Sequence, residues 1–177
     1  VVRCNHQTAG HGRNGHIWES QKGQDLLMSI LIKELKNPQD LYKLAQIASC
    51  SVVELLDRYG IEGKIKWPND IYVDDLKICG ILVEALHQDE SDAVVIGIGL
   101  NVNSISGEYA SMKMKMGQKS RRDRIYEWVS MHTREQILLY GTLQQGALTQ
   151  ELADILNIDR SNVSRELNIL VREGLTV

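Results

Sequence analysis

The sequence of 177 residues lacks several features that define whole classes of protein. No apolar run approaches the roughly 18 residues that a membrane-spanning helix needs, which argues against a membrane protein. The opening segment VVRCNHQ has neither the pattern of a secretory signal nor an initiating methionine. We therefore expect a cytoplasmic protein with no membrane partner, whose natural N-terminus lies upstream of Val1.

Cysteine is also scarce, which bears on disulfides and metal sites. The three cysteines are odd in number and form no Cys-x-x-Cys pair, so we interpret them as reduced thiols. Three histidines recur every five residues, a spacing that suits neither a helix face nor a strand face: His6, His11 and His16. The sequence therefore predicts no metal site built by the protein alone.

The charge is unevenly distributed along the chain. Residues 1–111 carry 10 Lys and Arg against 15 Asp and Glu, whereas residues 112–177 carry 10 against 8. Six basic residues lie between positions 112 and 124, a composition typical of a solvated linker or basic arm. We predict a first domain over 1–111, a basic linker over 112–119 and a second domain over 120–177.

The first domain has the pattern of an α+β sheet. Residues 25–32, 64–67, 70–73, 77–86 and 93–102 are short, largely apolar strand candidates. Between the first two, apolar residues recur at three and four positions from Leu41 to Leu55, which predicts one helix that opens near Pro38 and stops at Gly60. One helix against sequential strands predicts a sheet with one covered face and one open face.

The segment from Gln7 to Ser20, QTAGHGRNGHIWES, is rich in glycine. Glycines at this spacing destabilise helices and strands by up to about 1 kcal/mol each, so we expect a loop. Successive amides in such a loop can converge on an anion, and Arg13 adds a fork of donors. The alternatives are a surface hairpin turn before a buried tryptophan and a dinucleotide-binding motif. We reject the second because a strand follows the glycines, where that motif requires a helix.

Three further motifs join this loop: Lys66–Asp70 (KWPND), Lys77–Glu84 (KICGILVE) and Ile96–Asn103 (IGIGLNVN). Together, over about residues 1–103, they resemble the catalytic domain of biotin protein ligases. The resemblance implies part of the mixed sheet with helices of biotin and lipoate ligases. It also implies ATP, biotin and Mg²⁺, the biotin carboxyl carrier domain of acetyl-CoA carboxylase as partner, and a homodimer as one form of assembly.

The same resemblance implies a two-step reaction and a set of site residues. Biotin is first joined to AMP from ATP, and a carrier lysine then takes the biotinyl group, with Arg13 and Lys77 as the catalytic cations. The residues implied to contact biotin or the adenylate are Gln7, Gly10, His11, Gly12, Arg13, Gly15, Trp18, Lys66, Asn69, Asp70, Lys77, Gly80, Ile81 and Asn101. Alternatively, Lys66 and Lys77 are ordinary solvated lysines, Trp18 packs the loop, and Asp70 caps a turn.

The chain also departs from the family pattern. His11, Asn14 and His16 stand where the loop of the family usually carries further arginines, so permanent positive charge is lost. A Ser/Thr-Asn segment that helps to hold biotin should precede Val1. The helices and small β-barrel that normally follow IGIGLNVN are expected to be absent, which would leave the biotin pocket without one wall.

Residues 120–177 have a different pattern, with a first helix capped by Ser120. Two further helices over about 149–172, joined by a turn at Asn157 and Ile158, predict a helix-turn-helix. The stretch resembles an all-α winged-helix DNA-binding domain with a truncated wing, in a joined or truncated chain. The predicted DNA-binding residues are Arg160, Ser161, Asn162, Ser164, Arg165 and Asn168. The alternative function is therefore a DNA-binding transcriptional regulator whose ligase-like part is an inactive or biotin-sensing remnant.

Overall fold

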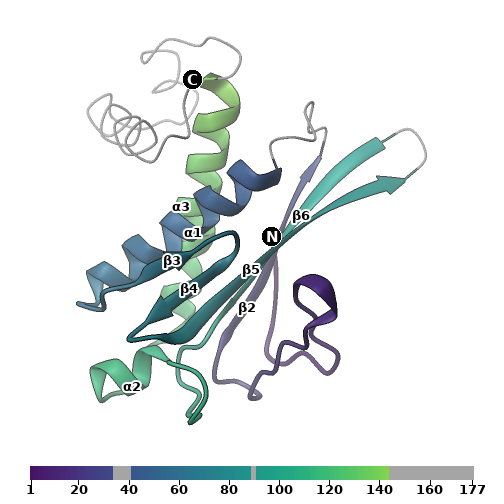
Figure 1. Ribbon diagram of the computed structural model, residues 1–177. Coiled ribbons are helices and arrows are strands. Elements are labelled where there is room, and N and C mark those ends of the chain that lie inside the picture. The colour runs from purple at the N-terminus through teal and green to yellow at the C-terminus, as the bar shows by residue number, and fades with distance from the viewer. Residues whose placement is uncertain (34–40, 89–90, 144–177) are drawn as a thin grey trace. The chain divides into compact units, whose positions relative to one another are not determined.

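The computed structural model describes residues 1–33, 41–88 and 91–143. The chain divides into two compact units, residues 1–130 and 131–177. The first unit holds a sheet of six strands in the order β1-β2-β6-β5-β4-β3 (Figure 1). The strands are β1 Val2–Cys4, β2 Leu26–Lys33, β3 Lys64–Lys66, β4 Asp70–Val73, β5 Leu76–Gln88 and β6 Ser91–Leu100.

Every neighbouring pair of these strands is antiparallel, and β4 and β5 are joined by a tight turn. Asp74 and Asp75, between β4 and β5, have φ angles of 47° and 63°. A two-residue hairpin turn with positive φ at both positions matches the twist of the flanking strands, and aspartate tolerates this conformation. The predicted turn at these residues is confirmed.

Helix α1, Leu41–Arg58, covers one face of the sheet. Its fully buried residues recur at helical spacing and include Leu44, Ile47 and Leu55. The helix contacts β5 and β6, in which Ile78 and Ile96 are also fully buried. The helix ends as predicted at Gly60, whose φ of 69° is left-handed. The N-terminal loop lies on the other side of the sheet (Figure 1). The expected α+β class, with one covered and one open face, is confirmed.

Two helices follow β6 in the described part of the chain, α2 Met112–Met116 and α3 Arg122–Leu143. The helix predicted to begin near Ser120 is confirmed by α3. The expected absence of the family's own helices and small β-barrel after IGIGLNVN stays a prediction. Ser111 caps α2 by accepting a hydrogen bond from the Met114 amide, and Met112 is completely buried. Charge alone predicts a solvated linker over 112–119, because it misses these alternating methionines. The position of the domain boundary stays a prediction.

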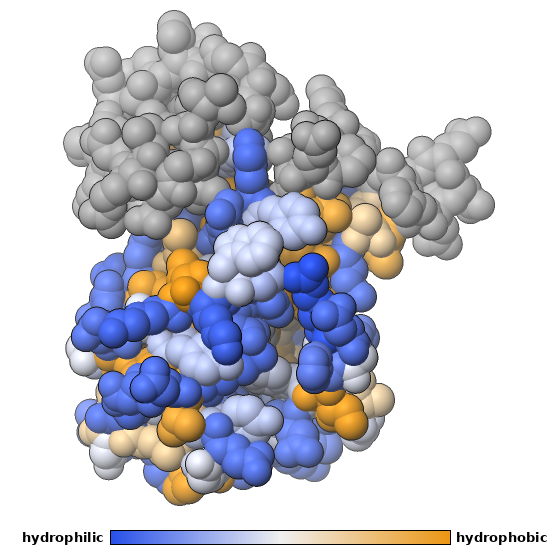
Figure 2. Space-filling view, viewed as in Figure 1, coloured by the Kyte–Doolittle hydropathy of each residue, from blue (hydrophilic) through white to orange (hydrophobic). Residues whose placement is uncertain are grey.

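The predicted helix-turn-helix, with all six candidate DNA-binding residues, lies outside the described residues. Among the described helices, none is long and apolar enough to cross a bilayer. In the view of Figure 2, hydrophilic residues cover most of the described surface and apolar residues form small separate groups. Scattered exposed apolar side chains are normal on a folded domain.

Candidate functional site

The open face of the sheet has a floor of bare backbone. Gly99 of β6 pairs directly with Gly80 of β5, and Gly97 pairs with Leu82. Residues two apart on a strand point to the same face, so the three glycines lie together on the side away from α1. On the neighbouring strand, Ser29 pairs with Gly97. The sheet therefore offers a shallow, largely apolar floor with one hydroxyl.

The glycine-rich loop lies over this floor as an irregular hairpin. The Trp18 amide donates to the Gly10 carbonyl at 3.0 Å, and the Gly12 amide donates to the His16 carbonyl at 2.6 Å. Between these rungs His11 and Ile17 form an isolated bridge. The tip is a short helical turn, η1 Arg13–Gly15. The loop thus has its own internal order.

Trp18 connects the loop to the floor. A Cβ added at Gly99 would lie 2.6 Å from the Trp18 ring atoms Cε2 and Cζ2, and one added at Gly80 would lie 3.0 Å from Cζ3. The indole therefore lies directly on the paired glycines, in space that any larger residue would fill. Its Nε1 is buried without a hydrogen-bond partner in the described structure. A buried donor of this kind favours a ligand that brings an acceptor.

A lysine and a carboxylate lie at the side of the floor. Lys77 Nζ is 2.7 Å from Asp70 Oδ1, and both side chains are about three-quarters buried, with 25% and 22% exposed. The same ammonium lies 5.6 Å from the centre of the Trp18 ring, within cation–π range. A lysine held at the edge of an apolar cleft is placed to meet an anion there.

Loop, floor and ion pair enclose a cleft of about 460 Å³, the size of a small-molecule site. It brings together ten of the predicted contact residues: Gln7, His11, Gly12, Arg13, Trp18, Asn69, Asp70, Lys77, Gly80 and Ile81. Among the described residues, the Arg13 guanidinium has no ion-pair partner. The cleft therefore has at least one cation available to a ligand.

Four predicted contact residues lie outside the cleft lining. Gly10 is buried against the Trp18 carbonyl, and Gly15 has a φ of 76° in the turn at the loop tip. Lys66 Nζ lies 4.6 Å from the centre of the Tyr72 ring. Asn101 is 7% exposed and donates from Nδ2 to the Ala110 carbonyl. Gly10 and Gly15 thus belong to the loop, Lys66 to β3, and Asn101 to the chain just after β6, and their part in binding stays a prediction.

Sequence reasoning missed part of the floor, because four lining residues lie outside the loop and every motif: Leu27, Met28, Ser29 and Val95. The other lining residues that it did not name as contacts lie within the loop or the motifs: Asn14, His16, Ile17, Pro68, Leu82, Glu84, Gly97, Ile98 and Gly99. Strand alternation offered a signal, because Gly97, Gly99 and Val95 share one face of β6. One further contact crosses the cleft mouth, where His11 Nε2 is 3.7 Å from Glu84 Oε2.

The buried thiol below the floor has a structural role. Cys79 is completely buried, and desolvation raises its pKa far above the ordinary thiol value, an effect that the nearby Lys77 ammonium only partly offsets. Such a thiol is a poor nucleophile.

Among the described residues, no group of three or more His, Cys, Asp or Glu could hold a metal ion.

Comparison with known proteins points to one family. Residues 1–101 match the model of the biotin/lipoate A/B protein ligase family. The bifunctional ligase/repressor BirA of Bacillus spizizenii is 38% identical over 111 residues, which are 62% of this chain and 34% of that protein. The biotin–[acetyl-CoA-carboxylase] ligase of Mycobacterium tuberculosis is 31% identical over 113 residues, 61% of this chain and 41% of that protein.

A solved structure supports the same relationship. The biotin protein ligase from Aquifex aeolicus in complex with biotin and ATP superimposes with a TM-score of 0.64 at 32% identity, over 75% of this chain and 58% of that one. The match extends past the family-model region, in keeping with the helices that follow β6. The chain spans about a third of the length of the Bacillus relative.

Proposed function

Because the chain belongs to the biotin/lipoate A/B protein ligase family, we propose that its cleft joins biotin to AMP from ATP and passes the biotinyl group to a protein lysine. The observation that carries the proposal is the composition of the cleft. A loop arginine, Arg13, and the Lys77–Asp70 pair line the same space as the glycine floor. Ligands that bring an apolar ring system, a carboxylate and a phosphate, as biotin and ATP do together, match this combination of an apolar floor and cations.

The first step places negative charge where the cleft has cations. The biotin carboxylate attacks the α-phosphorus of ATP, the bond to the β-phosphate oxygen breaks, and pyrophosphate leaves. Charge is spread over the α-phosphoryl oxygens in the transition state, so catalysis depends on positioned donors. We assign Arg13 and Lys77 to those oxygens, since a guanidinium offers two parallel hydrogen bonds and an ammonium a compact charge.

The apolar part of the ligand is assigned to the floor. Gly80, Gly97 and Gly99 give a flat surface, with Ser29 as a hydroxyl partner. The Trp18 indole already covers Gly80 and Gly99, so we place the biotin rings beside it, against Gly97 and Ser29. The predicted contacts of Gln7, His11, Gly12, Asn69 and Ile81 fit the same cleft, and the loop covers the acyl adenylate and limits its hydrolysis.

Magnesium fits the site only together with the nucleotide. Mg²⁺ in phosphate-transfer enzymes binds through one or two carboxylates plus substrate phosphates. Asp70 is the carboxylate that pairs with Lys77 at the cleft, and Asn69 is next to it in the lining. We assign these two residues to hold the ion that arrives with ATP, where it would neutralise phosphate charge.

In the second step the amine of an acceptor lysine attacks the acyl carbon of biotinyl-AMP, and AMP leaves. The name of the Mycobacterium relative gives acetyl-CoA carboxylase as its substrate. We propose the biotin carboxyl carrier domain of that enzyme as the partner of this chain. A homodimer and a cytoplasmic location stay predictions from the sequence.

The test is release of pyrophosphate from ATP. Purified protein should release pyrophosphate when biotin is added and release none with lipoate, which controls for the other acid substrate in the name of the family. Mass spectrometry of the bound fraction should show biotinyl-AMP. Release that does not depend on biotin, or that lipoate supports equally, contradicts the proposal.

We also propose that the C-terminal residues bind DNA, the predicted partner of that segment. The support is sequence pattern together with the name ligase/repressor given to the Bacillus relative, and the candidate residues lie outside the described structure. The ligase assignment is favoured over a regulator with a disabled cleft, because the cleft retains Arg13 and Lys77. Binding to DNA fragments should weaken steeply with salt, since phosphate contacts release counterions. Binding that does not respond to salt would contradict it.

A further inference from the structure

The two ends of the cleft loop meet in a short stem below it. The Gly23 amide donates to the Asn5 carbonyl at 2.8 Å, and the Gln7 amide donates to the Ser20 hydroxyl at 3.3 Å. Gly23 has a φ of 72°, which lets the chain turn back into β2. Asn5 therefore stands at the entry of the loop, and Asp25 stands just after its exit.

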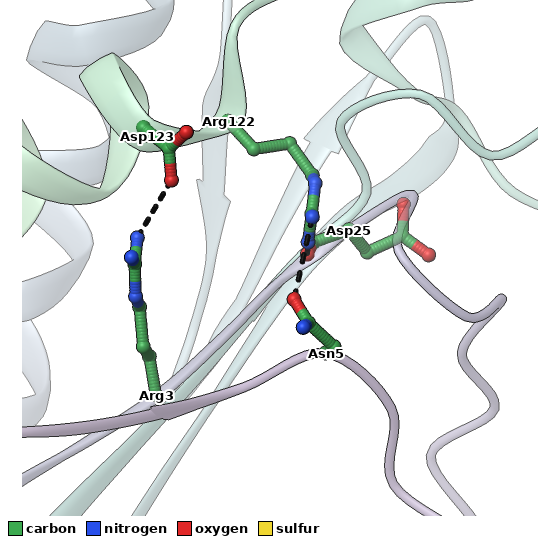
Figure 3. A network of polar contacts seen from close by, with 5 residues as sticks. All are labelled: Arg3, Asn5, Asp25, Arg122 and Asp123. Atoms are coloured by element: carbon green, nitrogen blue, oxygen red, sulfur yellow. Dashed lines mark hydrogen bonds and ion pairs between the residues drawn. The ribbon is translucent and has the colours of Figure 1, made fainter.

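One side chain from a distant helix contacts both sides of this stem. Arg122, the first residue of α3, donates from Nη2 to the Asn5 side-chain oxygen at 3.3 Å and from Nη1 to the Asp25 carbonyl at 3.2 Å (Figure 3). The planar guanidinium can hold two acceptors in a fixed geometry, which a lysine cannot. Arg122 thus joins the entry and the exit of the loop.

The residues around Arg122 hold each side of the stem in place. Asp123 pairs with Arg3 of β1 at 2.8 Å, just before the loop entry (Figure 3). On the exit side Asp25 is 2% exposed and its Oδ1 accepts the amides of Val102 at 3.0 Å and Ser104 at 3.3 Å. The Arg3–Asp123 pair is exposed and contributes little alone. The bridging contacts of Arg122 are the feature that joins the two sides.

We propose that Arg122 is a positioning residue for the cleft, which acts by closing the stem of the loop that carries Arg13 and Trp18. The reason is geometric, because a loop fastened at its base has fewer conformations to lose when its tip closes on a ligand. Arg122 touches no cleft-lining residue in the contacts above, so its effect passes through the loop. For ligand binding, the inference rests on the proposed function.

The experiment compares Arg122→Ala with Arg124→Ala in the full chain. Arg124 lies two residues further along the same helix, is exposed and belongs to no ion pair in the described structure. Its replacement therefore removes the same positive charge from the helix as the replacement of Arg122. Amide hydrogen exchange of residues 7–20 is measured without ligand. We expect exchange at the Gly12 and Trp18 amides to quicken about 2- to 13-fold in Arg122→Ala, which is the net contribution of one ordinary hydrogen bond, and to stay at the parent rate in Arg124→Ala.

A second variant separates positioning from a general loss of stability. Arg122→Lys keeps the charge but cannot reach both acceptors, so its loop should also exchange faster while the melting temperature stays at the parent value. In the biotin and ATP assay, KM for biotin should rise by a similar factor in both Arg122 variants, with kcat nearly unchanged.

Equal loop exchange in Arg122→Ala and Arg124→Ala would overturn the proposal, as would faster exchange that spreads evenly over α1. Faster loop exchange with an unchanged KM would overturn the positioning role. If the parent protein forms no adenylate from biotin, the proposed function fails, and the exchange measurement without ligand still decides whether Arg122 orders the loop.

Discussion

Replacing Gly99 by alanine should lift Trp18 from the sheet. The new Cβ would lie 2.6 Å from two ring atoms of the indole, whereas ordinary van der Waals contact begins at 3.4 Å. The ring must therefore move by about 0.8 Å. Gly99 lies on a strand that is paired on both sides. The sheet is therefore fixed, and the loop that carries Trp18 should move instead.

The cost of this displacement follows from overpacking in proteins. Forcing a methyl group into a filled contact costs about 1 to 3 kcal/mol. Because the loop can move away, most of that cost should lower the population of the closed loop, by about 5- to 150-fold. The free energy of global unfolding should change little, since the core around Ile98 and Leu100 keeps its contacts.

The assay is the indole NH spectrum of the labelled protein. The chain has three tryptophans, and the signal of Trp18 is assigned by its loss in Trp18→Phe. In Gly99→Ala this signal should shift or broaden, and the Trp18 amide should exchange faster. Gly97→Ala is the matched control, because its Cβ would meet the Leu82 carbonyl oxygen at 3.6 Å, an ordinary contact. An unshifted Trp18 signal in Gly99→Ala would refute the packing described here.

Three other predictions concern charge and reactivity. The Lys115 ammonium lowers the pKa of Asp74 through a hydrogen bond and charge attraction. The contribution of this pair to folding stability is therefore present above the ordinary pKa of about 3.9 and is lost as pH falls below it. Asp74→Asn should have a lower melting temperature than the parent at pH 7 and the same melting temperature near pH 2. A persistent difference in acid would contradict this. Iodoacetamide at pH 8.5 should label exposed Cys4 and leave Cys79 unlabelled, because burial raises the pKa of Cys79; labelling of both in the folded protein would show that the sheet opens. Lys77→Gln should slow adenylate formation by about 2 to 4 kcal/mol of transition-state stabilisation, and an unchanged rate in single-turnover assays would remove Lys77 from catalysis.

Most of the fold could be predicted from local pattern. The helix from Leu41, its stop at Gly60 and the turn at Asp74 follow from apolar spacing and from residues that accept positive φ. These are local properties, which a single sequence carries. The helix at Met112–Met116 was missed because its alternating lysines suggest solvent exposure, whereas Met112 is completely buried.

The candidate site was predictable only in part. Motif residues such as Arg13 and Lys77 could be found, because their neighbours in sequence carry the pattern. Ser29 lies in no motif and could not be assigned to the cleft, since its role depends on which strand pairs with which. Gly99 lies in a motif, but its contact with Trp18 could not be predicted. The bridge from Arg122 to the loop stem joins residues more than 90 positions apart, and the sequence predicted only a basic segment that leads into a helix.

Formation of biotinyl-AMP in this cleft is tested most directly by a single-turnover reaction of the protein with biotin and labelled ATP. Bound products are identified by mass spectrometry in the parent and in Arg13→Ala. We predict biotinyl-AMP retained by the parent, and in Arg13→Ala an adenylate that leaks into solution, because the loop no longer holds its phosphate. Absence of biotinyl-AMP from the parent, or equal retention by Arg13→Ala, would contradict the account.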